Sequence, residues 1–184
     1  MDSSVPLFDF AAVWSSRALL LQGFGIAMFC ATAAIVLAMI IGLLIALMRL
    51  SNSRFLRGFA FIYTQLFRGV PLYVLVIWVY FGLAIVANIN LPKVPAGIIT
   101  LALLNSGYLS ETFRSGILAV NIGQTEAGAA IGLTKRQIKR YIVLPQAFRI
   151  VLAPSGNQFV DAIKDTAILS IIGVPELMRM AQQQ

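Results

Sequence analysis

The sequence contains no histidine and one cysteine, Cys30. A disulfide within the chain needs two cysteines, so none is expected, and metal sites rich in cysteine or histidine are excluded as well. The lack of histidine also removes the side chain that most often transfers protons in enzymes. No Gly-x-x-x-x-Gly-Lys-Ser/Thr phosphate-binding loop occurs in the sequence. These absences predict a protein that is not an enzyme and that needs neither a metal nor a cofactor.

Charged residues are also scarce, at 11% of the chain, whereas hydrophobic residues make up 59%. Soluble domains average about 25% charged and about 45–50% apolar residues, so this composition predicts an integral membrane protein. The net charge of +7 does not indicate nucleic-acid binding, because the cations lie in short segments between apolar stretches. The first residues lack a basic segment and a small-residue cleavage site, so we expect no removable signal peptide.

Four apolar stretches predict four membrane-spanning helices, so the expected fold class is an all-α, polytopic membrane protein. We place the spans at residues 22–48, 72–86, 96–118 and 150–174; a span needs about 20 mainly apolar residues. The first span contains many glycines and alanines, which let helices approach closely in lipid. Residues 59–67 are apolar but too few to cross, and we expect an interfacial segment there.

Lysine and arginine are distributed unevenly among the segments that connect the spans. Cytoplasmic loops of membrane proteins are enriched in these residues, so their distribution predicts the orientation of the chain. It places the N-terminal segment, residues 1–17, in the periplasm and residues 123–148 in the cytoplasm. The cations assigned to the cytoplasmic side are Arg49, Arg54, Arg57, Arg68, Arg114, Lys135, Arg136, Lys139, Arg140 and Arg149, and those assigned to the outer side are Arg17, Lys93 and Arg179.

Residues 123–148 form the only long polar interruption of the apolar sequence. We expect Gly132 to end a first short helix, because glycine readily takes the left-handed conformation found at such ends. Thr134 and Gln137 have the spacing of a capping box, which predicts the start of a second helix. Pro145 is expected to end that helix and to push Leu144 out of the helical region. One side of the second helix is basic and favours an anionic neighbour, either a partner protein or lipid: Lys135, Arg136, Lys139 and Arg140.

This stretch resembles the EAA loop of the membrane subunits of ATP-binding-cassette importers. The pattern of that loop is Glu-Ala-Ala, three residues, Gly, nine residues and Ile-x-Leu-Pro. The matching segments here are Glu126-Ala127-Gly128, Gly132 and Ile142-Val143-Leu144-Pro145, with Gly128 as the one departure. The alternative is an amphipathic helix that binds only lipid. The resemblance implies that the loop couples to a cytoplasmic ATPase through Glu126, Ala127, Gly132, Ile142, Leu144 and Pro145.

Two further segments resemble the polar amino-acid branch of the same importers. Residues 68–72, Arg-Gly-Val-Pro-Leu, are similar to its Arg-Gly-Thr-Pro-Leu signature, and residues 164–166 are similar to its Lys-Asp-Thr/Ser signature. The resemblance implies a type I importer transmembrane domain over residues 18–184, without catalytic chemistry of its own. Family members usually carry one more span after residues 173–177, so we expect that the last span is missing and that the chain is a truncated copy.

The resemblance also implies where the protein works and with which partners. It implies a permease subunit in the bacterial inner membrane that translocates amino acids of the histidine, glutamine, arginine or opine type. The implied partners are a cytoplasmic ABC ATPase, a periplasmic amino-acid-binding protein, a second permease subunit, identical or related, and the lipid bilayer. The rival classes are a secondary transporter or channel, for which no inverted repeat is visible, and an intramembrane enzyme, for which no catalytic pair is present.

Charged side chains within the predicted spans are candidates for a translocation pathway. A charge at membrane depth costs at least about 2.5 kcal/mol, so such residues pair or line water. Glu111 lies three residues before Arg114 and can pair with it, either as a structural ion pair or as part of the pathway. Asp161, Lys164 and Asp165 share one helix face, and their net negative charge suits the ammonium group of an amino acid. The alternative is a self-satisfied triad that only holds this span to its neighbours.

Overall fold

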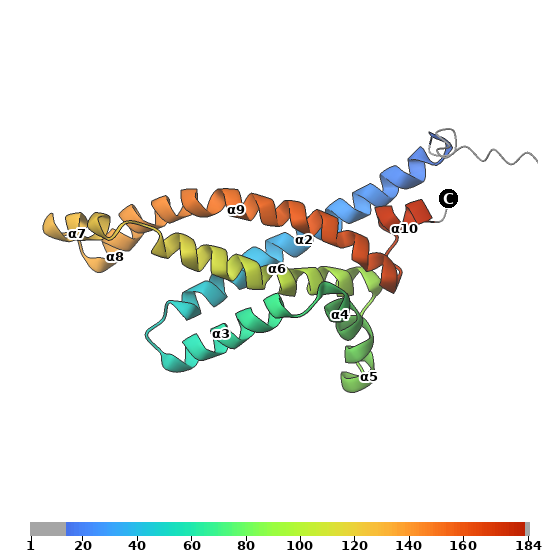
Figure 1. The fold of residues 1–184 in the computed structure, drawn as a ribbon, viewed down its shortest axis with the longest axis horizontal. Helices are drawn as coiled ribbons and strands as arrows, with labels where there is room; N and C mark the ends of the chain where they lie inside the picture. The colour runs from blue at the N-terminus through green and yellow to red at the C-terminus, as the bar shows by residue number, and fades with distance from the viewer. Residues whose placement is uncertain (1–13, 183–184) are drawn as a thin grey trace, which may run out of the picture.

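The computed structural model of the chain describes residues 14–182 as an elongated bundle of helices (Figure 1). No strand occurs in that range, so the predicted all-α fold class is confirmed. The predicted periplasmic segment, residues 1–17, lies mostly outside the described residues. The α-helices are α2 (Arg17–Arg49), α3 (Arg54–Gly69), α4 (Leu72–Ile77), α5 (Leu83–Ala87), α6 (Lys93–Leu118), α7 (Ile122–Ala130), α8 (Lys135–Gln137), α9 (Leu144–Asp165) and α10 (Leu177–Gln182). Two π-helical turns, η1 (Trp78–Gly82) and η2 (Ile138–Val143), and a 3-10 helix, η3 (Thr166–Ile172), complete the chain.

Helices α2 and α6 make the most extensive contact in the bundle. The buried face of α2 is a stripe of small residues that recurs every three or four positions. At Gly42 an added Cβ atom would lie 3.0 Å from the Leu109 Cβ and 3.1 Å from the Ser106 carbonyl oxygen. The two backbones are too close there for a larger side chain, as expected from the small residues of the first span. The stripe includes Gly23, Ala27, Cys30, Ala31, Ala34, Ala38, Gly42 and Ala46.

Buried apolar residues attach the C-terminal part of the chain to this helix pair. One cluster joins Ala34 of α2 and Leu101 of α6 to Leu169 of η3. A second cluster joins Ala38 of α2 to Ala162 of α9. These contacts hold α9 alongside α6, and Figure 1 shows the two helices running together along the bundle. The position of α9 relative to α6 is thus fixed by the core.

The chain breaks between α3 and α4 at Val70 and Pro71. Both residues are extended, with ψ angles of 128° and 137°, and α3 meets the segment Leu72–Ala87 at 105°. Pro71 has no N–H to continue the helix, and its ring disfavours a helical conformation at Val70. Residues 59–67 lie within α3, which packs along α6, and the π turn η1 interrupts the predicted span 72–86. The predicted interfacial segment, residues 59–67, is thus part of α3, and the predicted span 72–86 forms the second arm of a bent pair of helices.

The length and polarity of the helices bear on the four predicted spans. Within residues 14–182, only α2 is long and apolar enough by itself to cross a membrane, and the bent pair meets the same test when it is taken as one unit. Helices α6 and α9 have 26 and 22 residues, about 39 and 33 Å, which exceeds the hydrocarbon thickness of about 30 Å. Their polar and charged residues lower their hydropathy, so only their length supports them as spans.

The predicted helix end at Pro145 is wrong. Leu144 has helical angles, φ −61° and ψ −43°, and the chain continues from α8 through the π turn η2 into α9 without a break. Proline is tolerated in the first turn of a helix, and Pro145 stands in the first turn of α9. The wider π turn before it also gives the proline ring space that a regular α-helical turn lacks. Residues on both sides of Pro145 therefore belong to one helical run.

Replacing Gly42 with leucine should destabilise the bundle, because the new side chain would be forced between α2 and α6. Overpacking of this kind costs about 1–3 kcal/mol. Gly25 lies on the same helix with no atom within 4 Å of an added Cβ, so Gly25→Leu is the matched control. Thermal unfolding in detergent should show a lower midpoint for Gly42→Leu and an unchanged midpoint for Gly25→Leu. Equal midpoints for the two variants would contradict the close approach of the helices.

Candidate functional site

A cavity of about 490 Å³ lies beside the break between α3 and α4. Three parts of the chain that are far apart in sequence meet there: the break itself, the middle of α6 and the C-terminal half of α9. The break brings the end of α3 to the cavity because the helix stops at Val70. The lining residues include Arg68, Pro71, Leu104, Tyr108, Gln158, Asp161 and Asp165.

The cavity carries charge of both signs. The guanidinium of Arg68 lies 5.3 Å from the centre of the Tyr108 ring, within the range of a cation–π contact. Asp161 and Asp165 lie one turn apart on α9 and also line the cavity. Within the described residues, no ion pair joins Arg68 to either aspartate. Arg68 and Asp165, which have no ion-pair partner within the described residues, are therefore available to a ligand that carries both charges.

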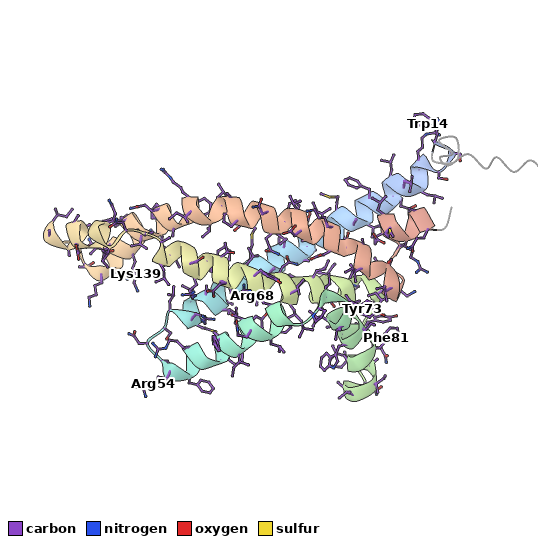
Figure 2. The ribbon with its side chains drawn as sticks, in the orientation of Figure 1. Trp14, Arg54, Arg68, Tyr73, Phe81 and Lys139 are labelled. Carbon is purple, nitrogen blue, oxygen red and sulfur yellow. The ribbon has the colours of Figure 1, made fainter. Side chains whose placement is uncertain are left out.

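Arg68 lies far from the cations at the ends of the bundle. It stands about 21 Å along α3 from Arg54, at about 1.5 Å per residue. Figure 2 shows Arg54 and Lys139 toward one end of the molecule, Trp14 at the other end and Arg68 between them. The structure therefore separates Arg68 from Arg54 and Lys139, with which the sequence pattern groups it.

A pair of side-chain amides supports one wall of the cavity. The Gln158 side-chain nitrogen donates to the Asn105 side-chain oxygen at 2.7 Å, and the Asn105 nitrogen donates to the Leu101 carbonyl oxygen at 2.7 Å. Asn105 is fully buried, and buried polar atoms need partners inside the protein. These bonds join α9 to α6 and hold Gln158 at the edge of the cavity.

Lys164 is paired but does not line the cavity. Its Nζ lies 3.3 Å from an Asp161 carboxylate oxygen, and its side chain is 71% exposed. Asp165, by contrast, is half-buried and has no ion-pair partner within residues 14–182. Of the three charges predicted on one face, Asp161 and Asp165 thus line the cavity, and Lys164 lies outside it and pairs with Asp161.

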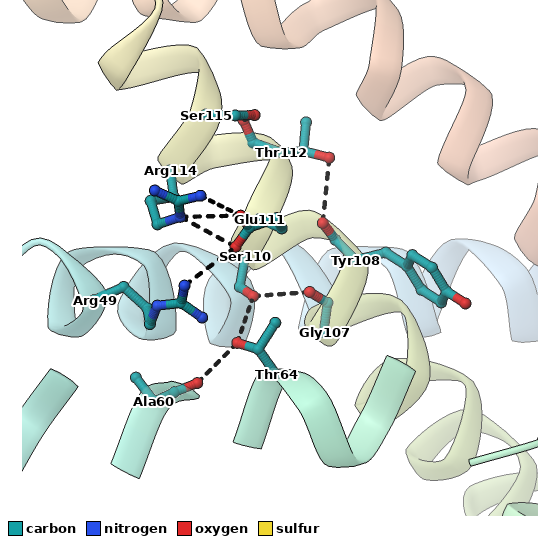
Figure 3. A network of polar contacts seen from close by, with 10 residues as sticks. All are labelled: Arg49, Ala60, Thr64, Gly107, Tyr108, Ser110, Glu111, Thr112, Arg114 and Ser115. Carbon is teal, nitrogen blue, oxygen red and sulfur yellow. Dashed lines mark hydrogen bonds and ion pairs between the residues drawn. The ribbon is translucent and has the colours of Figure 1, made fainter. Parts of the chain in front are cut away.

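Glu111 belongs to a separate network (Figure 3). Arg114 binds its carboxylate as predicted, with the Arg114 Nε 3.1 Å from both oxygens, and Arg49 of α2 approaches it to 3.8 Å. Beside this group, the hydroxyls of Thr64 and Ser110 lie 3.2 Å apart and join α3 to α6. The network ties α2, α3 and α6 together at one level, which favours the structural interpretation of the Glu111 pair. A role of Glu111 in translocation remains a prediction.

Residues 121–143, which we name the polar hairpin, form a pair of short helical segments at one end of the bundle (Figure 1). The Asn121 side chain accepts a hydrogen bond from the Gly123 N–H at 2.8 Å and starts α7. Gly132 has a φ angle of +83° after the end of α7, so the predicted left-handed glycine is confirmed. The Thr134 N–H donates to the Gln137 side-chain oxygen at 2.8 Å, and the predicted capping box is confirmed.

Gly128, the one departure from the loop pattern, closes the polar hairpin. An added Cβ atom there would lie 2.7 Å from the Ile142 Cδ1 and 3.1 Å from the Ile138 Cγ1. Glycine therefore lets α7 pack directly against η2. Ile142, one of the predicted coupling residues, faces this contact and supports the hairpin from inside.

The other predicted coupling residues lie on the surface. Glu126 and Ala127 are exposed on α7, and nothing lies within 4 Å of an added Cβ at Gly132. The backbone around Gly132 is thus open to a partner. Leu144 and Pro145 are also exposed, but they lie beyond the polar hairpin, in the first turn of α9.

Three polar or charged residues of the cavity are not among the pathway residues predicted from the sequence: Arg68, Tyr108 and Gln158. The sequence offers a signal for the first of them, since Arg68 stands three residues before Pro71 within an apolar stretch. Broken helices at membrane depth are tolerated only where they are buried in protein or line a cavity, so charge beside such a break is informative. Tyr108 and Gln158 have no comparable signal, because their meeting depends on how α6 and α9 pack.

A bundle with a broken helix, a cavity of mixed charge and an exposed polar hairpin has the features of a membrane transport subunit. Comparison with known proteins agrees with this class. Residues 34–184 match the family described as binding-protein-dependent transport system inner membrane component. The chain belongs to this family.

Individual relatives define the branch more closely. The chain is 32% identical over 177 residues to the glutamine transport system permease protein GlnP of Escherichia coli (strain K12), covering 96% of this chain and 81% of that protein. It is 40% identical over 149 residues to a putative glutamine transport system permease protein of Rickettsia prowazekii (strain Madrid E), covering 81% and 68% of the two chains. The chain is thus homologous to amino-acid permease subunits of ABC importers, as the EAA resemblance predicts.

Solved structures of ABC transporters have the same fold. The crystal structure of an amino acid ABC transporter with histidines matches with a TM-score of 0.91 and 34% identity, over 96% of this chain and 82% of that one. The inward-facing MetNI methionine ABC transporter matches with a TM-score of 0.76 and 19% identity, also over 96% and 82%, and shows the fold alone. The predicted type I importer fold is therefore confirmed.

Gly128→Leu should weaken the polar hairpin, because the leucine side chain would collide with Ile138 and Ile142. A cost of about 1–3 kcal/mol corresponds to amide exchange in α7 that is at least about fivefold faster. Ala129 is the next residue and is exposed, so Ala129→Leu is the matched control. Hydrogen exchange measured by mass spectrometry should separate the two variants. Equal protection of α7 in both would show that the contact at Gly128 does not hold the hairpin.

Proposed function

We propose that this chain is the permease subunit of a polar amino-acid importer and that the cavity beside Arg68 binds the amino acid during translocation. The observation that carries the proposal is one cation, Arg68, and two carboxylates, Asp161 and Asp165, around a single cavity. An amino acid is a zwitterion, so its carboxylate matches the guanidinium and its ammonium group matches the aspartates. Relatives named for glutamine and a transporter crystallised with histidines support the same substrate class.

The size and position of the cavity support this role. Its volume of about 490 Å³ lies within the range of about 300–1,000 Å³ that is usual for small-molecule sites. The broken backbone at Val70 and Pro71 lies directly beside it, where a membrane protein tolerates irregular structure. Leu104 and Tyr108 add an apolar surface for the rest of the substrate.

The polar hairpin is the proposed contact with a separate cytoplasmic ATPase. The chain has no phosphate-binding loop of its own, so ATP hydrolysis requires another subunit. Glu126, Ala127 and Gly132 are exposed on the hairpin, and Glu126 offers a carboxylate to a cation of the ATPase. A periplasmic amino-acid-binding protein would deliver substrate at the opposite end, and a second permease subunit would complete the pathway.

The proposed location is the bacterial inner membrane, with the N-terminal segment in the periplasm. The family description names an inner membrane component. Arg54 and Lys139 lie toward one end of the bundle and Trp14 at the other in Figure 2. The enrichment of cytoplasmic loops in lysine and arginine supports a cytoplasmic position for the polar hairpin.

Asp165→Asn should impair uptake by the assembled transporter, because it removes a carboxylate from the proposed ammonium site. Hydrogen bonds to charged groups contribute about 1.5–3 kcal/mol, so KM should rise about tenfold or more. Asn157 is exposed on the same helix and is not among the cavity residues, so Asn157→Ala should keep the wild-type KM. Uptake of radiolabelled polar amino acids into proteoliposomes measures both. If Asp165→Asn instead prevents assembly of the complex, the carboxylate serves packing and the pathway role fails.

Gly132→Asp should weaken binding of the ATPase while membrane insertion stays normal. The substitution places a side chain on the open backbone and strains a residue at φ +83°. Gly132→Asn is the control, because asparagine tolerates the left-handed region. Docking at Gly132 predicts partial recovery of binding with asparagine, whereas a role limited to ending α7 predicts full recovery. Pull-down of the ATPase measures this, and wild-type recovery with both variants would disprove docking at Gly132.

A further inference from the structure

A second cavity, an apolar groove between α2, α6 and α9, has no part in the proposed transport function. Its volume is about 430 Å³, and Met39 of α2 and Phe113 of α6 contribute to its walls. Leu144, Phe148 and Leu152 of α9 also line it and are each more than half exposed, so the groove opens at the surface of the bundle. We name it the α9 groove.

The length of the α9 groove corresponds to one leaflet of a bilayer. Its lining extends along α9 from Leu144 to Ser155, which is about 16 Å at about 1.5 Å per residue. Half of the hydrocarbon core of a bilayer is about 15 Å thick. Leu144, Phe148 and Leu152 recur at a spacing of four and so lie on one side of the helix. A single acyl chain can therefore lie along the groove from the membrane surface toward the centre.

Cations gather at the end of the groove that lies next to the polar hairpin. Arg140 stands four residues before Leu144 in the same helical run, about one turn beyond the groove. No aspartate or glutamate occurs in residues 127–160, so the positive charge is not balanced nearby in the sequence. Four exposed cations form this cluster, and none of them is in an ion pair within the part of the chain that the structure describes: Lys135, Arg136, Lys139 and Arg140.

An aromatic residue marks the boundary between the cations and the groove. Tyr141 is 64% exposed, and the Arg140 guanidinium lies 5.8 Å from the centre of its ring. Tyrosine is enriched where membrane proteins meet the headgroup layer. A phospholipid carries an anionic headgroup and apolar chains on one molecule, so it is complementary to the cations and to the groove together.

We propose that the cation cluster and the α9 groove bind one anionic phospholipid. Its phosphate lies at Lys139 and Arg140, and one acyl chain lies against Phe148 and Leu152. Basic clusters directly beside a spanning helix attract anionic lipids, and the apolar groove adds a place for the chain. The site is separate from the cavity beside Arg68, so its failure would leave the proposed amino-acid site unaffected.

The charge of the site can be tested with the purified full chain in nanodiscs of equal parts phosphatidylglycerol and phosphatidylcholine. After extraction into mild detergent, native mass spectrometry counts the retained lipids, and the wild-type chain should retain phosphatidylglycerol preferentially. Lys139→Gln combined with Arg140→Gln should reduce this retention about tenfold. Arg54→Gln combined with Arg57→Gln removes the same charge from exposed residues at the start of α3, away from the groove, and should retain the lipid. Equal loss in the two double variants would overturn the proposal.

The groove is tested by filling it without any change of charge. Met39→Trp should reduce phosphatidylglycerol retention, whereas Val36→Trp, on an exposed position of the same helix outside the groove, should not. If the Lys139→Gln, Arg140→Gln double variant loses lipid and Met39→Trp does not, the lipid is held by charge alone. No acyl chain then lies in the groove, and the proposal is wrong. If the charge variant keeps its lipid but no longer binds the ATPase, the cations face the ATPase and the proposal is wrong.

Discussion

Helix α3 ends at Gly69, because Pro71 has no backbone N–H and its ring disfavours a helical conformation at Val70, and the chain bends by 105° between α3 and Leu72–Ala87. Arg68 consequently lies at the end of a helix, and the next helical turn does not enclose its guanidinium. The cavity forms where this end meets α9, and the bond between Gln158 and Asn105 holds α9 in place. The tight packing of α2 on α6 supplies the frame against which both helices are fixed. The charged cavity thus lies where the break between α3 and α4 meets α6 and α9.

Charge within the bundle is accommodated in two different ways. Glu111 is bound by Arg114 and approached by Arg49, so its carboxylate is satisfied by the protein itself. Arg68 and Asp165 have no such partners within the described residues, although they line the same cavity. The paired charges of Glu111, Arg114 and Arg49 hold α2 and α6 together. Unpaired charge of both signs is costly within the bundle unless a ligand or water completes it, which explains why it occurs at a cavity.

Local features of the chain could be predicted from the sequence, and features that depend on packing could not. Gly132 and the capping box of Thr134 follow from backbone conformation and spacing within a few residues, and both are found as expected. The continuation of the helix through Pro145 was not predictable, because it depends on a π turn that has no clear sequence signal. In the sequence, Gly128 is only a departure from the EAA pattern. The structure gives the reason for it, because Ile138 and Ile142 lie too close for a larger side chain at this position.

The helical run from Lys135 to Ile172 is continuous across α8, η2, α9 and η3. Asp161 lies on this run about 31 Å from Arg140, at about 1.5 Å per residue. No loop interrupts this run between the polar hairpin and the cavity. Pro154 interrupts the hydrogen-bond ladder within α9 and makes bending easiest there. The run therefore joins the polar hairpin to the two aspartates of the cavity through one helical backbone, and its backbone hydrogen bonding is weakest at Pro154.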